Sequence, residues 1–215
     1  MRVFYFWRMR RNLYLLITGL TLFSCSDQNS GKEENAEEKP KSNASSEKAV
    51  FDSLLSKFPD RSLPLRVKIN DGNLLLDDQF EITPQSKYIG FFRDTNTYRA
   101  FGKFDLSGGK TALISLYPAD DWIPVLTVYD ANGKLLSREF LVQRGCHQDC
   151  GYIYCASWLE ILPGFDMTLS DTLDYRICDE NGKEGEREHF TLRTLGKIDD
   201  DGRIRFSEGE TITLQ

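Results

Sequence analysis

The chain has 215 residues, 40% of them hydrophobic and 28% charged, with a formal net charge of −6. Residues 1–24 contain four arginines and no acid, so the remainder has a formal net charge of −10. A domain this acidic repels phosphate backbones, and no stripe of lysine and arginine interleaved with aromatics overrides that charge. We therefore expect no nucleic-acid partner.

Residues 1–24 have the pattern of a secretory signal peptide. Arg8, Arg10 and Arg11 precede an apolar run over residues 13–23, which is followed by a small residue at the expected cleavage site. An apolar run of this length is too short to span a bilayer as a helix. The signal therefore predicts export of the rest of the chain.

The tetrapeptide Leu22-Phe23-Ser24-Cys25 resembles the lipobox of bacterial lipoproteins, with Cys25 as the acylated residue. Phe23 departs from the small or β-branched residue that usually stands at its position. The resemblance implies a membrane partner, reached through a lipid anchor on Cys25. Ser26 is not the aspartate associated with retention in the inner membrane, so the resemblance implies the outer membrane, on its periplasmic or surface face. The alternative is an ordinary secretory signal that ends near a cysteine.

Residues 25–49 predict a lipidated cysteine followed by a disordered tether, because residues 26–49 contain no aromatic and no aliphatic larger than alanine. A globular domain is then expected over residues 50–215. It opens with one short helix whose apolar side chains recur at helical spacing and which ends before Pro59. These apolar residues are Val50, Phe51, Leu54, Leu55 and Phe58.

From Leu63 onward the apolar period changes to two, which predicts strands. The expected strands cover residues 63–69, 98–104, 111–117, 125–129, 134–142, 152–161, 172–178, 189–195, 203–206 and 211–214. Asn-Gly and Asp-Gly turn signals stand between several of them. The pattern predicts an all-β fold, an antiparallel meander of about eight to ten strands that forms a sandwich or a barrel.

Four cysteines remain after Cys25, namely Cys146, Cys150, Cys155 and Cys178. An even number of cysteines in an exported domain favours two disulfides over free thiols. A Cys146–Cys150 bond with a Cys155–Cys178 bond between strands is one of three possible connectivities, and spacing does not choose among them. Zinc is the weaker alternative, because the spacing lacks the paired C-x2-C of zinc knuckles.

Asp120, Asp121 and Trp122 form a candidate ligand platform in a loop between two expected strands. A tryptophan ring can stack on a sugar while carboxylates accept hydrogen bonds from its hydroxyl groups. The alternative is ordinary half-buried packing of Trp122. The loop over residues 197–208 approximates a calcium-binding pattern, but Lys197 stands where the first acidic ligand is required.

The catalytic motifs of common hydrolases and nucleotide-binding enzymes are missing from the sequence, and only His147 and His189 are available for acid–base chemistry. We therefore expect no catalytic residues, no metal and no cofactor. The favoured hypothesis is a membrane-anchored, non-catalytic domain that binds an envelope protein or a glycan. The alternative is an envelope enzyme that uses carboxylates from scattered positions.

Overall fold

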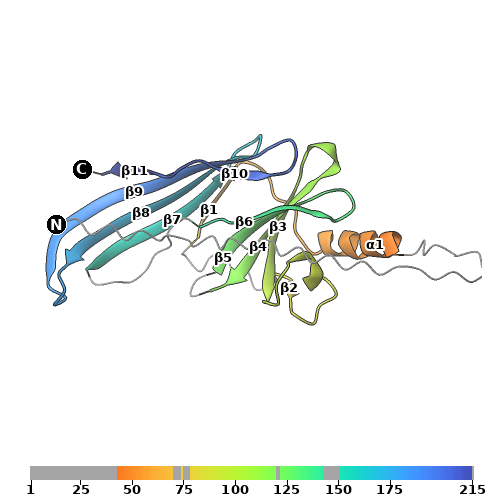
Figure 1. The fold of residues 1–215 in the computed structure, drawn as a ribbon, viewed down its shortest axis with the longest axis horizontal. Coiled ribbons are helices and arrows are strands. Elements are labelled where there is room, and N and C mark those ends of the chain that lie inside the picture. The colour runs from red at the N-terminus through yellow and green to blue at the C-terminus, as the bar shows by residue number, and fades with distance from the viewer. Residues whose placement is uncertain (1–42, 70–73, 75–77, 120–121, 143–150, 215) are drawn as a thin grey trace, which may run out of the picture. The chain divides into compact units, whose positions relative to one another are not determined.

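The computed structural model describes residues 43–69, 74, 78–119, 122–142 and 151–214. They form one helix, α1 (Asn43–Leu55), two short 3-10 turns, η1 (Ile89–Phe91) and η2 (Ser107–Gly109), and two antiparallel sheets (Figure 1). In sheet A the strand order is β2 (Glu81–Ile82), β3 (Tyr98–Asp105), β4 (Thr111–Pro118), β5 (Trp122–Tyr129) and β6 (Leu135–Phe140). In sheet B it is β1 (Leu65–Lys68), β7 (Tyr152–Ile161), β8 (Asp166–Cys178), β9 (Glu184–Ile198) and β10 (Ile204–Phe206), and β11 (Glu210–Thr213) also pairs with β9.

The two sheets share a hydrophobic core, which confirms the predicted all-β sandwich. Ile114 and Leu126 from sheet A belong to the same buried cluster as Leu159 and Leu169 from sheet B. This arrangement follows from the alternation of apolar residues along each strand, which places one apolar face of each sheet against the other. The described residues form eleven strands, slightly more than the eight to ten expected.

A second buried cluster lies on the other face of sheet A and includes α1. Phe51 and Leu54 of α1 are 1% and 0% exposed and pack with Tyr129, Leu113 and other residues of that face. The Phe51 ring centroid lies 5.1 Å from that of Tyr129. The helix is therefore part of the domain rather than a loose appendage.

The helix begins earlier than its apolar pattern predicts. It starts at Asn43, so the domain boundary at residue 50 and a disordered tether reaching Ala49 are corrected by the structure. The side chains of residues 45–49 are exposed. These exposed residues are helical because the part of α1 that follows them, with the buried Phe51 and Leu54, nucleates the helix. Each residue added to a nucleated helix gains a backbone hydrogen bond.

Three hairpin turns share one construction, as the Asn-Gly and Asp-Gly signals predict. Asp130 Oδ1 accepts hydrogen bonds from the backbone N–H groups of Asn132 and Lys134, at 2.8 and 3.0 Å. Asp179 and Asp199 make the equivalent pairs of bonds in their own turns. In the first two of these turns Gly133 and Gly182 have φ angles of +83° and +77°, in the left-handed region that glycine enters without steric cost.

Two of these glycines provide a matched test of how tightly α1 is packed. A Cβ at Gly133 would lie 2.6 Å from Cγ of Phe51, whereas a Cβ at Gly182 would meet nothing within 4 Å. Gly182→Ala should cost about 1 kcal/mol of unfolding free energy through backbone strain alone. Gly133→Ala should cost a further 1–3 kcal/mol, roughly the penalty for overpacking a core.

Urea unfolding of the two variants measures this difference. Equal losses of stability would contradict the close packing of Phe51 over Gly133.

Within the described ranges, no helix has both the length and the hydropathy needed to cross a membrane.

Candidate functional site

The sequence-predicted ligand platform is only partly within the described residues. Asp120 and Asp121 lie outside them. Trp122 is half-buried and packs against the core between the sheets, and the Arg99 guanidinium lies 5.0 Å from the centre of its ring. The described contacts of Trp122 therefore correspond to the packing alternative rather than to an open stacking surface.

The other aromatic residues near the cysteine cluster lie on sheet B rather than beside Trp122. Trp158 is partly buried, with Arg66 4.7 Å from its ring centre. Tyr152 and Tyr154 are 39% and 47% exposed at the start of β7. Trp122 and these tyrosines belong to different sheets.

Two of the four candidate disulfide cysteines are described. Cys155 and Cys178 are both disulfide-bonded, while Cys146 and Cys150 lie outside the described residues. In the register of the two strands Cys155 lies opposite Leu173, well before Cys178 along β8. This offset separates the two cysteines by on the order of 16 Å along the strand. A disulfide tolerates only about 4.4–6.8 Å between Cα atoms, so a Cys155–Cys178 bond is excluded.

Sheet B extends beyond the part that packs on sheet A. We call residues 152–156 of β7, 172–178 of β8, 184–192 of β9 and all of β11 the sheet B extension. Neither hydrophobic core cluster contains a residue of this extension. Figure 1 shows the long strands β7, β8 and β9 continuing past the end of sheet A. Sequence periodicity alone misses this feature, because alternation looks the same on a covered and an uncovered sheet.

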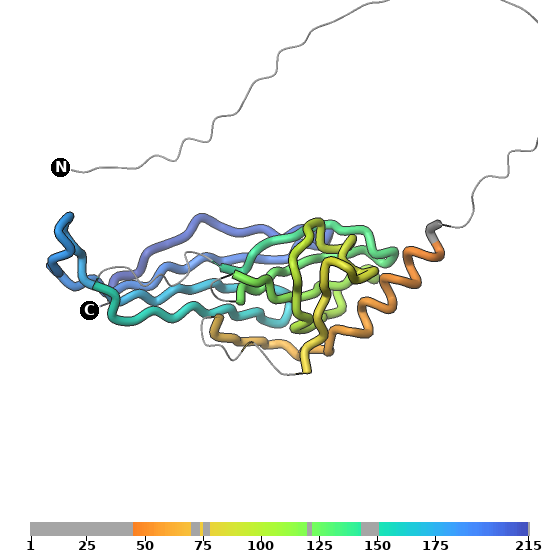
Figure 2. Tube along the Cα trace, turned by 90° about the horizontal axis from the view of Figure 1, so that it is seen from below, coloured from red at the N-terminus to blue at the C-terminus, as the bar shows by residue number. Residues whose placement is uncertain are grey.

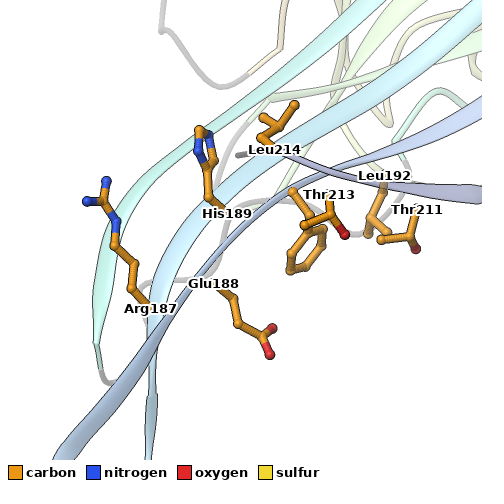
Figure 3. A pocket seen from close by; sticks show the side chains of 8 residues that line it. Arg187, Glu188, His189, Leu192, Thr211, Thr213 and Leu214 are labelled. Atoms are coloured by element: carbon orange, nitrogen blue, oxygen red, sulfur yellow. The ribbon is translucent and has the colours of Figure 1, made fainter.

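One face of the extension continues the core-facing side of sheet B and is largely apolar. Leu173 and Phe190 are register partners on this face, and the ring of Phe190 contacts the edge of Tyr175 at 5.9 Å between centroids. Tyr175 donates a hydrogen bond of 2.7 Å to Glu188. Residues of β9 and β11, with Leu214, line a groove of about 840 Å³ (Figure 3). Its lining comprises Arg187, Glu188, His189, Phe190, Leu192, Thr211, Thr213 and Leu214.

The opposite face of the extension is polar and is fixed by an ion pair. Arg187 donates hydrogen bonds of 2.8 and 2.5 Å to the two carboxylate oxygens of Asp174. These bonds hold the pKa of Asp174 below its ordinary value. His189 stands next to Asp174 across the strands and contributes to the same lowering.

The described carboxylates with shifted pKa values all carry structural interactions. They are Asp94, Asp174 and Asp199, and each pKa is lowered. Asp199 is held by the backbone N–H of Arg203 and by the side chain of Arg205, so its carboxylate is already engaged within its own turn. A general acid at neutral pH needs the opposite shift.

The outer edge of β7 is only partly paired with β1. β1 pairs with β7 only between Trp158 and Ile161, and one further hydrogen bond of 2.7 Å joins Ile69 N to Ser157 O. Among the described residues, no strand pairs with residues 152–154 on that side. Ile153, in this stretch, is 45% exposed, and Ile177 on the adjacent strand is 44% exposed.

This edge lacks the features that usually protect an exposed strand. Residues 151–157 contain neither a charged residue nor a proline. The sequence signal that could have identified it is the run Tyr152-Ile153-Tyr154, which breaks the alternation of apolar and polar residues and places large apolar side chains on both faces.

No protein family, curated protein or solved structure matches the chain.

Proposed function

We propose that the chain is a lipid-anchored protein of the bacterial envelope whose domain binds a partner protein without catalysis. In this proposal the open edge of β7 accepts an extended strand of the partner, which adds to sheet B. The observation that carries the proposal is the combination, at residues 152–154, of a strand edge with no pairing strand among the described residues and exposed apolar side chains.

The chemistry of the edge favours a protein over a glycan. The backbone N–H and C=O groups of an edge strand are complementary to those of another extended polypeptide. An added strand would also lie against Tyr152, Ile153 and Tyr154, large apolar side chains that are exposed on the two faces of β7. The half-buried Trp122, covered by Arg99, offers less to a sugar ring.

The anchor and the binding edge are tested separately. Cys25→Ala should remove the lipid, so the variant should move from the detergent phase to the aqueous phase in a detergent partition or remain unprocessed. Acylation with more than one chain is what makes such anchoring stable. Wild-type protein found in the aqueous phase would contradict the anchor.

The binding edge is tested with Ile153→Lys, which places a charge on the strand that the partner would pair with. Leu195→Lys is the matched control, because Leu195 is 52% exposed but pairs with β8 on one side and is hydrogen-bonded to Ser207 on the other. The lipidated protein is used to capture partners from solubilised envelope, with a photocrosslinker at residue 154. Ile153→Lys should reduce the crosslinked partner at least tenfold while Leu195→Lys retains it. Equal recovery with both variants would contradict binding at this edge.

A further inference from the structure

A second concave site lies at the end of the domain where the chain leaves for its anchor. A pocket of about 720 Å³ is formed between α1, the turn around η1 and the Asp130–Lys134 turn. We call it the α1 pocket. Ser46, Glu47 and Val50 contribute from the helix, and Phe91, Tyr129 and Gly133 form part of its wall.

Three cations lie on this pocket although the domain is strongly acidic. They are Lys87, Arg93 and Lys134, against the single acid Glu47. Six other arginines form ion pairs with carboxylates, at Arg99, Arg138, Arg176, Arg187, Arg193 and Arg205. Within the described part of the chain, none of the three pocket cations forms one; Lys87 instead lies 5.1 Å from the ring centre of Tyr88.

The backbone conformation around the pocket positions two of these cations, Arg93 and Lys134. Arg93 has a φ angle of +58°, in the left-handed region that costs a residue with a side chain about 1 kcal/mol or more. Lys134 follows the turn that Asp130 holds through two backbone hydrogen bonds. Tyr129 donates a hydrogen bond of 2.7 Å to the carbonyl of Phe91, and burial raises its pKa to about 12, so the wall beside the cations is neutral.

We infer that the α1 pocket binds the phosphate groups of anionic lipids in the membrane that holds Cys25. This inference rests on the proposed lipid anchor. The pocket is lined by Ser46, Glu47 and Val50 of α1, and the 17 residues between Cys25 and Asn43 can span at most about 60 Å. This length allows the pocket to reach the membrane surface, where basic residues are attracted to anionic headgroups.

Docking through the α1 pocket would orient the domain. Figure 2 shows α1 and the turn between β8 and β9 at opposite ends of the described domain. Contact of the α1 end with headgroups would therefore direct the sheet B extension, with its open β7 edge, away from the bilayer and towards a partner.

The test uses the mature chain carrying Cys25→Ser, so that acyl chains do not dominate binding. Sedimentation with vesicles of phosphatidylcholine alone or mixed with phosphatidylglycerol should show binding only to the mixed vesicles, and this binding should weaken as salt is added. The double variant Arg93→Gln, Lys134→Gln should bind about 30-fold more weakly, from the usual contribution of two basic residues near a membrane.

The control is Arg203→Gln, Lys183→Gln, which removes one arginine and one lysine that are also exposed but lie outside the α1 pocket. It should bind as the parent chain does. Equal weakening of both double variants, or no preference of the parent chain for phosphatidylglycerol, would overturn the inference.

A calorimetric titration with inorganic phosphate separates the two sources of the same chemistry. Phosphate binding that depends on Arg93 and Lys134, without vesicle binding, would assign the pocket to a soluble phosphate compound and overturn membrane docking. Ile153→Lys should leave vesicle binding unchanged, so failure of this inference is distinguishable from failure of partner binding at the β7 edge.

Discussion

Replacing Cys178 with serine is expected to lower the free energy of unfolding by about 3 kcal/mol, the usual contribution of a disulfide that closes a loop of this size. Cys178 is disulfide-bonded, and the strand register excludes Cys155 as its partner. The backbone N–H of Arg176 donates a hydrogen bond of 2.7 Å to the carbonyl of Gly151, so the residue that follows Cys150 in the sequence lies beside the end of β8. We therefore predict the pairs Cys150–Cys178 and Cys146–Cys155.

The second pair provides the internal comparison. A Cys146–Cys155 bond closes a shorter loop, so Cys146→Ser should cost less than Cys178→Ser. Urea unfolding of both variants measures the two losses, and peptide mapping of unreduced protein identifies the pairs. A crosslinked peptide containing Cys146 and Cys150 would contradict the prediction, and so would four thiols that alkylate without reduction.

The alternation of apolar and polar residues predicted several individual strands well, because it is a property of each strand's own sequence. β7 has the bounds expected from its sequence, and the strands β3, β4 and β10 differ from expectation by one residue at an end. β8 and β9 are much longer than expected and begin at Asp166 and Glu184. The additional residues of β8 include the buried Met167 and Leu169 at alternate positions, whereas residues 184–188 at the start of β9 have no apolar period and become strand by pairing with β8.

The candidate site was less predictable for the same reason. The exposure of Ile153 depends on where sheet A ends, and the α1 pocket depends on two turns that meet beside a helix whose start was expected at residue 50. Both are long-range properties of packing. Aromatic and acidic residues adjacent in sequence, such as Asp121 and Trp122, pointed instead to a platform whose tryptophan is half-buried.

Replacing Tyr98 with phenylalanine is expected to cost about 2 kcal/mol, the usual range for buried hydrogen bonds to charged groups. The hydroxyl of Tyr98 donates to Asp94 and accepts a hydrogen bond of 2.5 Å from Arg138, which also pairs with Asp94 at 2.9 Å. Tyr98 is fully buried, so the hydroxyl has no water to replace these partners. The three residues join the loop after η1 to β3 and β6.

Tyr88→Phe is the matched control, because Tyr88 is also buried and its hydroxyl shares a hydrogen bond of 2.8 Å with the neutral Ser53. It should cost about 1 kcal/mol, as expected for a bond between neutral groups. Thermal or urea unfolding at neutral pH compares the two variants. A loss for Tyr98→Phe no larger than that for Tyr88→Phe would show that the charged partners add nothing.

The same network should make stability depend on pH in the acid range. Burial alone would raise the pKa of Asp94, but hydrogen bonds from Tyr98, the Asn96 N–H and Arg138 outweigh it and lower that pKa below its ordinary value of 3.8. A carboxyl whose pKa is lowered in the folded state binds protons more readily in the unfolded state. Its ionised form therefore stabilises the fold fully at pH values above the unfolded-state pKa, and this stabilisation is lost as pH falls through the lowered folded-state pKa. The stability difference between wild type and Asp94→Asn should therefore be constant from neutral pH to about pH 5 and shrink below about pH 4. A difference that stays constant down to pH 2 would mean that the ionised form of Asp94 is not what holds Tyr98 and Arg138 together.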